Sequence, residues 1–305
     1  MTSTTPSPLV SVVMTVWNGE RLVGESIDSI LRQTFTDLEL IVVDDGSTDG
    51  TCAVIESFRD PRLRLLKRPH QGIVSSANFG VSQARGKYIA RLDADDLSLP
   101  DRLEWQVKAF CEKPETVLCY TDIEVFGDLT EWKKPGRFIA DGGLIALKMC
   151  YGCPLTHSSV LYRKNAFERA GGYLLKTPVA EDYSLYTRLI RQGPFVGIPR
   201  KLVKYRRTSS SATFRHYDEM ARIAREIGLE HMQAFLGVDA SMAPSIFENL
   251  CLPPAKRNGR LWRYFCWMAL RRPTTWGPEP LGWMFLQSLK ALFPSSEAKG
   301  DEARL

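Results

Sequence analysis

The chain has 305 residues, of which 44% are hydrophobic and 25% charged, and a net charge of +5. This composition excludes a disordered chain, and the mild charge gives no reason to expect nucleic acid as a partner. No secretion signal and no run long enough to span a membrane is visible, so we expect a cytoplasmic protein.

Apolar runs alternate with helical patterns through the first hundred residues. Strands are predicted at residues 10–14, 38–43, 63–66 and 88–92, and helices at 22–31, 52–58 and 77–84. This alternation predicts parallel βαβ units, and therefore an α/β protein with a Rossmann-like, mostly parallel sheet flanked by helices. Ligands of such sheets bind beyond the carboxyl ends of the strands.

The pattern is more mixed after residue 103. A helix is expected at 103–110, strands at 117–120 and 158–162, a helix at 181–190, and two short strands near Phe195 and Val203. The chain from His216 onward reads as helices. We expect a disordered N-terminus at 1–8, an α/β domain at 9–213 and a helical C-terminal region at 214–305.

The C-terminal region interleaves aromatic and basic side chains between residues 260 and 285. Such a helix suits the surface of an anionic membrane. It equally suits packing against the α/β domain or a second subunit, so that oligomerisation is the alternative. Both interpretations stay open at this point.

Three carboxylates, those of Asp93, Asp95 and Asp96, follow the strand predicted at 88–92. Neighbouring carboxylates repel one another, and burying them is costly unless a cation compensates. The cluster therefore predicts a divalent metal whose coordination a phosphate completes. A solvated acidic turn is the alternative, and Asp96 has its own one, which is to cap the helix that starts near Pro100.

Two further strand ends are polar. Thr15, Trp17 and Asn18 follow the first strand, and Asp45 follows the second. A nucleotide base would find hydrogen-bonding backbone groups and a stacking ring at Thr15 and Trp17, and a carboxylate acceptor for its N–H at Asp45. A simple turn with a helix cap is the alternative for Asp45.

The ordered set of motifs resembles family 2 glycosyltransferases, which have the GT-A fold. The motifs that carry this resemblance are residues 12–18, 29–35, 42–49, 78–80, 84–96, 99–103, 157–164, 171–173 and 181–183. Together they extend over the first two thirds of the chain. Each motif is weak alone, whereas their order is specific.

The resemblance implies an inverting, metal-dependent enzyme that uses a nucleoside diphosphate sugar, above all a UDP-sugar. It implies Asp95 as the ligand of Mg²⁺ or Mn²⁺, Asp93 at the ribose, and Asp182, with Glu181 beside it, as the general base. His157 is expected near the diphosphate or the acceptor, and Arg206 at the diphosphate.

The implied acceptor is a glycan or a lipid-linked glycan in cell-envelope polysaccharide synthesis, with the enzyme held peripherally on the inner face of the plasma membrane. The sequence departs from the family pattern twice. Arg207, Thr208 and Ser209 stand where a His often follows, which leaves a third metal ligand in doubt, and Ala77 stands where an Arg is common.

Two rival functions remain at this point. One is a sugar-nucleotide-binding protein without turnover, which the two departures favour. The other is an Asp-dependent phosphohydrolase, against which Leu97 stands two residues after Asp95, where that chemistry favours Thr or Val.

Overall fold

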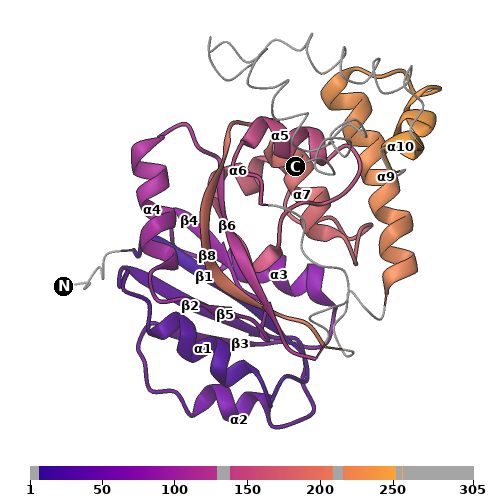
Figure 1. The fold of residues 1–305 in the computed structure, drawn as a ribbon. Helices are drawn as coiled ribbons and strands as arrows, with labels where there is room; N and C mark the ends of the chain where they lie inside the picture. Colours follow the sequence, from indigo (N-terminus) through magenta and orange to yellow (C-terminus); the bar gives the residue numbers. More distant parts are fainter. Residues whose placement is uncertain (1–6, 129–137, 209–215, 252–255, 257–305) are drawn as a thin grey trace, which may run out of the picture.

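The computed structural model describes residues 7–128, 138–208, 216–251 and 256, and Figure 1 shows their arrangement. Eight strands form one sheet in the order β3-β2-β1-β4-β7-β6-β8-β5. The strands are β1 (Val10–Val16), β2 (Leu38–Asp44), β3 (Leu63–Lys67), β4 (Tyr88–Arg91), β5 (Leu97–Ser98), β6 (Leu118–Phe126), β7 (Val160–Arg163) and β8 (Phe195–Arg206).

Helices cover both faces of this sheet (Figure 1). They are α1 (Val23–Leu31), α2 (Thr51–Glu56), α3 (Ile73–Ser82), α4 (Arg102–Glu112), α5 (Gly142–Lys148), α6 (Lys164–Arg169), α7 (Glu181–Leu189), α9 (Tyr217–Leu236) and α10 (Ala243–Cys251), with a 3₁₀ turn η1 (His157–Ser159) before β7. The helix α6 was not foreseen from the sequence.

The predicted βαβ units are confirmed in the first half of the chain. Strands β3, β2, β1 and β4 are neighbours and all parallel. Val16 of β1 pairs with Asp44 of β2, and Val13 of β1 pairs with Arg91 of β4. The carboxyl ends of these three strands therefore meet at one edge of the sheet, as the sequence predicted.

The second half of the sheet is mixed. Strand β7 lies antiparallel between β4 and β6, while β8 runs parallel to β6. The two short strands expected near Phe195 and Val203 are wrong, because they are parts of the single strand β8. Proline cannot donate a ladder hydrogen bond, and Pro199 falls where the pairing with β6 shifts its register, so one strand looked like two.

Each face of the sheet has its own hydrophobic core. Val13 points into the core shared with α3, α5 and α7, whereas Val12 and Met14 point into the core shared with α1 and α4. Alternate residues of a strand face opposite sides, so the unbroken apolar run of β1 serves both layers.

The helices predicted after His216 are confirmed as far as Cys251. Met232 of α9 and Ile246 of α10 share a core with Leu147 of α5. None of the helices in the described part of the chain is long and apolar enough to cross a membrane. The predicted boundary at 213 and the aromatic, basic segment at 260–285 lie outside the described residues.

A hollow of about 500 Å³ lies at the opposite edge of the sheet, where Leu9, Gly86 and Lys164 line it. These residues mark the amino ends of β1 and β4 and the carboxyl end of the antiparallel β7. The hollow is therefore a full strand length away from the polar strand ends.

Candidate active site

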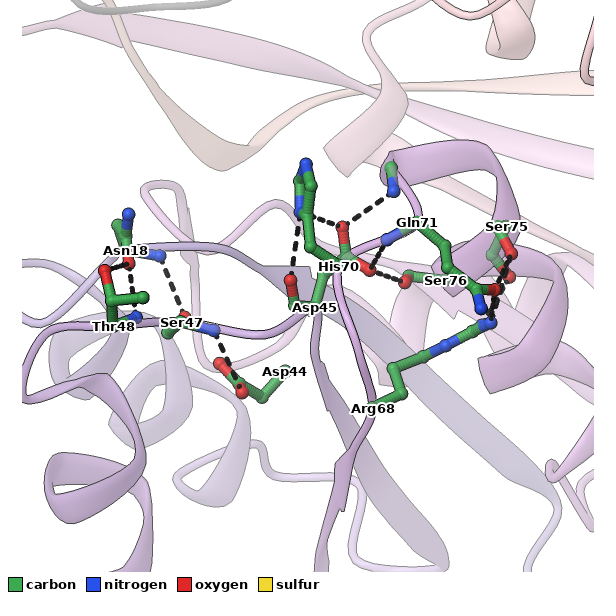
Figure 2. Close-up of polar contacts among 11 residues, drawn as sticks. Asn18, Asp44, Asp45, Ser47, Thr48, Arg68, His70, Gln71, Ser75 and Ser76 are labelled. Carbon is green, nitrogen blue, oxygen red and sulfur yellow. Dashed lines mark hydrogen bonds and ion pairs between the residues drawn. The ribbon is translucent and has the colours of Figure 1, made fainter.

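The end of β2 is tied to the start of α3 by Asp45 (Figure 2). Its carboxylate accepts hydrogen bonds from the backbone N–H groups of Gln71 (3.0 Å) and Gly72 (2.9 Å) and from Ser76 Oγ (2.6 Å). These donors belong to the first turn of α3 and the loop before it, so Asp45 satisfies N–H groups that a helix leaves unpaired. Helix α3 begins at Ile73, earlier than the predicted residue 77, because this cap comes from a distant strand.

The loop after β1 carries Trp17 and Asn18. Trp17 is half-exposed, and its ring stacks on His70 with centroids 4.5 Å apart. Asn18 has a positive φ of 52°, which Asn tolerates better than most residues, and its side-chain oxygen accepts from Thr48 N at 2.8 Å. Asn18 thus joins the loops after β1 and β2. Thr15 lies beside Val43 of β2, one residue before the polar edge.

The carboxylates after β4 occupy different environments. Asp93 and Asp95 are partly exposed, whereas Asp96 is fully buried. Burial, and then the charge of Asp93, raise the pKa of Asp95 to about 6. Two carboxylates in this state form an anionic pair that a cation would stabilise.

Asp96 does not cap a helix, because α4 begins at Arg102 with Asp101 at its N-cap. Its two oxygens accept instead from Ser158 Oγ (2.5 Å) and from the backbone N–H of Arg206 (2.7 Å). Asp96 therefore fixes the turn to η1 and to the end of β8.

Arg206 is bound into the protein at three points. Its Nε donates to the backbone oxygen of Asp95 (2.8 Å), its Nη2 pairs with Glu25 (2.7 Å), and its guanidinium lies over the ring of Phe126. The predicted contact of Arg206 with a diphosphate stays a prediction. The visible role of this side chain is to hold the turn that carries Asp95.

Arg91 lies beneath these carboxylates and is fully buried. It donates to Val13 O (2.8 Å) and to His157 Nε2 (3.1 Å), and its Nη2 lies 3.6 Å from Asp93. Removing an ionised guanidinium from water is costly, so the arrangement is stable only with anions nearby. Arg91 is thus the buried counter-charge of this cluster.

His157 faces the interior. Arg91 can only donate, so His157 Nε2 is unprotonated and also accepts from the hydroxyl of Tyr173 at 2.9 Å. Burial and the charge of Arg91 hold the pKa of His157 well below its usual value. The imidazole is therefore neutral, and its predicted place near the diphosphate or the acceptor stays a prediction.

Glu181 and Asp182 open α7, and Asp182 Oδ1 accepts from the backbone N–H of Tyr183 at 2.6 Å. Burial, followed by the charge of Asp182, raises the pKa of Glu181 to about 8. Burial also raises the pKa of Asp182 to about 6, with Asp93 adding to the increase. The electrostatic influence of Asp93 on both groups places the two carboxylate pairs in one cluster around Arg91.

The donor set fits a hard cation such as Mg²⁺ or Mn²⁺. Asp93 and Asp95 offer carboxylate oxygens, and Mg²⁺ is usually held by one or two carboxylates together with substrate phosphates. Among the described residues, no three His, Cys, Asp or Glu side chains gather as a ready-made metal site. A phosphate ligand would therefore be needed to complete the coordination.

Sequence reasoning did not single out three residues of the site. Arg91 carries a usable signal, because it is a charge inside an apolar strand. Ser158 and His70 carry none, because their partners are distant in the chain and only the fold brings them together.

Residues 11–195 match the model of the family Glycosyl transferase family 2. An uncharacterized glycosyltransferase of Haemophilus influenzae is 30% identical over 261 residues, which cover 78% of this chain and 79% of that protein. Chondroitin synthase of Pasteurella multocida is 32% identical over 193 residues, which cover 62% of this chain and 19% of that protein.

Two solved structures resemble the fold. TarS 1–349 of S. aureus in complex with UDP has a TM-score of 0.55 and 17% identity over 86% of this chain and 87% of that one. The mannosyltransferase PcManGT of Pyrobaculum calidifontis, in complex with GDP-Man and Mn²⁺, has a TM-score of 0.58 and 18% identity over 95% and 82%. The chain thus has the GT-A fold, as predicted.

Proposed function

The chain belongs to glycosyl transferase family 2, and we propose that it moves a sugar, with inversion, from a nucleoside diphosphate sugar to a hydroxyl of a glycan or lipid-linked glycan. The observation that carries this proposal is the cluster in which Asp93, Asp95, Glu181 and Asp182 gather around the buried Arg91. The family assignment leaves no support for the phosphohydrolase alternative.

Asp182 is the proposed general base. With a pKa of about 6 it is mostly ionised at neutral pH, yet basic enough to accept a proton. The acceptor oxygen attacks the anomeric carbon, its proton passes to the carboxylate of Asp182, and the bond from the sugar to the diphosphate breaks. Glu181, whose pKa is about 8, is mostly protonated at neutral pH and can donate a hydrogen bond.

Asp95, with Asp93 beside it, would hold Mg²⁺ or Mn²⁺. When bound, such a cation neutralises charge on the departing diphosphate. Arg206 keeps the Asp95 turn in place through its bond to the backbone oxygen. Trp17 is the proposed stacking surface for the base, because its ring is exposed at the end of β1.

Relatives support the classes of donor and acceptor. TarS is solved with UDP and PcManGT with GDP-Man and Mn²⁺, which favours a nucleotide-sugar donor, and we propose a UDP-sugar. The likeness to a chondroitin synthase favours a polysaccharide product, which we place in the cell envelope. A peripheral contact of the C-terminal region with the inner face of the plasma membrane belongs to the same proposal.

A thermal-shift panel of UDP-, GDP- and dTDP-sugars, each with and without Mn²⁺, tests the donor and the metal together. A ligand at a hundred times its dissociation constant stabilises by about 2.7 kcal/mol. We therefore expect one donor class to raise Tm by about 5 °C, and only when Mn²⁺ is present.

The Asp95→Asn variant should lose this metal-dependent shift, while Asp28→Asn, an exposed aspartate on α1, should keep it. The absence of any shift with every nucleotide would overturn the proposal.

A further inference from the structure

The carboxylate of Asp45 has no lone pair left for a nucleotide base. Oδ1 accepts from Gln71 N and Ser76 Oγ, and Oδ2 accepts from Gly72 N and lies 2.9 Å from His70 Nδ1. A carboxylate offers about four acceptor positions, and protein groups fill all of them. A base N–H could bind Asp45 only by displacing one of these donors.

The ring of His70 has a fixed orientation. Its Nδ1 lies 3.0 Å from the backbone oxygen of Asp45 as well as 2.9 Å from Oδ2, and both atoms are acceptors. Nδ1 must therefore carry the proton, and in the neutral ring the other nitrogen, Nε2, has a free lone pair. Figure 2 shows Nε2 at the end of the ring that points away from Asp45.

The same ring borders the surface proposed for the base. The side chain of His70 is 52% exposed and stacks on Trp17 with an angle of 30° between the ring planes. A base stacked on an aromatic ring at this corner would bring its edge towards groups that stand at the rim of that ring.

Other acceptors at this corner are taken or covered. The side-chain oxygen of Asn18 accepts from Thr48 N, and Asp44 is buried with 3% exposure. Arg68 is turned away, since its guanidinium lies over Phe79 and bonds Ser75 (Figure 2). His70 Nε2 is therefore an exposed acceptor placed beside the stacking ring.

Resting on the donor class proposed above, we propose that His70 Nε2 accepts the ring N–H of the donor's nucleobase and selects the base. Uracil, thymine and guanine carry a ring N–H next to a carbonyl. Cytosine and adenine have an unprotonated ring nitrogen at the equivalent position, so two lone pairs would face each other. Asp45 is then a positioning residue, which holds His70 upright and caps α3.

Calorimetry with two matched nucleotide pairs in the presence of Mn²⁺ tests this proposal. UDP and CDP differ at the pyrimidine edge, and GDP and ADP at the purine edge. One hydrogen bond is worth about 1 kcal/mol or more, so we expect wild type to prefer UDP to CDP, or GDP to ADP, by at least about fivefold. In His70→Ala this ratio should fall to within about twofold, because the preferred nucleotide loses affinity and its partner does not.

His216→Ala, at an exposed histidine before α9, is the matched control and should leave the ratio unchanged. A uniform loss for all four nucleotides in His70→Ala would overturn the proposal, because it indicates a purely structural role. Tighter UDP binding in His70→Ala would also overturn it, because the ring would then be blocking the base.

A wild-type protein that binds UDP and CDP equally, and likewise GDP and ADP, would overturn the role of His70 and leave the proposed function intact. If wild type bound none of the four, the proposed function itself would fail, and this inference with it.

Discussion

The base corner and the carboxylate cluster lie at neighbouring strand ends, but they treat negative charge in opposite ways. At the base corner, Asp45 receives hydrogen bonds from two backbone N–H groups and a hydroxyl. In the cluster, four carboxylates share the buried Arg91, and the pKa values of Asp95, Glu181 and Asp182 are all raised. One region has its charge satisfied by the fold, and the other has a surplus of negative charge.

This difference separates binding from reaction. A satisfied corner is rigid before the ligand arrives, so it can recognise a base at little reorganisation cost. A cluster with surplus charge gains most from a cation, a proton or a bound group that supplies what is missing. Substitutions in the two regions should therefore change different measurements, and the next predictions test that division, beginning with the largest effect.

Asp182→Asn should have the largest effect and should act on the rate alone. The amide cannot accept a proton, and losing a general base costs about 10²–10⁴-fold in rate. We expect the turnover rate to fall by about 10³-fold while the dissociation constant for the donor nucleotide changes by less than about threefold. Turnover assays and calorimetry on the same preparation measure both quantities.

The control for this variant is Asp218→Asn, because Asp218 occupies the first turn of α9 as Asp182 does in α7. A matching drop in both variants would point to helix stability instead of catalysis. A large loss of donor affinity in Asp182→Asn would break the proposed division between the two regions.

Trp17→Ala should show the reverse pattern. Stacking of a base on an aromatic side chain is worth about 1–3 kcal/mol, so the nucleotide should bind about 5- to 100-fold more weakly. Turnover at saturating donor should change by less than about threefold, because Asp182 is untouched. Trp17→Phe, which keeps a stacking ring, should restore most of the affinity; equal loss in both variants would contradict stacking.

Glu181→Gln should give the smallest effect, and it should depend on pH. The pKa of Glu181 rises from 4.5 to about 8 on folding, so its contribution to stability is complete below pH 4.5 and is lost as the pH rises through about 8. Glutamine cannot ionise, so the variant avoids this loss. We expect the variant to gain roughly 1–2 kcal/mol over wild type at pH 9 relative to pH 5.

Thermal unfolding of the donor-free, metal-free protein at several pH values measures this difference. Glu219→Gln, at an exposed residue in the first turn of α9, should show no such trend. A stability difference between Glu181→Gln and wild type that stayed constant from pH 5 to pH 9 would show that the cluster carries no surplus charge at Glu181.

Most of the sheet edge could be predicted from the sequence, because apolar runs and the polar residues after them are local signals. The runs ending at Val16, Asp44 and Arg91 became parallel strands with their ends together. The first-turn positions of Glu181 and Asp182 were equally legible, because acidic residues favour helix starts.

What could not be predicted depends on pairs far apart in the chain. Asp96 is fixed by Arg206, 110 residues later, and no local pattern reveals that bond. The continuity of β8 depends on how β6 shifts its register around Pro199, which is a property of the partner strand. The assignment of Asp45 as an acceptor for the base overlooked the first turn of α3, which fills its oxygens.

The cap that Asp45 provides to α3 also affects how mutational data on this enzyme should be interpreted. Asp45→Ala would uncap a buried helix end and release the ring of His70 in one step. Screens that score only product formation would count position 45 as a donor contact, although its side chain touches no substrate. Pairing such a screen with a measure of folded protein abundance would separate residues that read the sugar nucleotide from those that build the surface reading it.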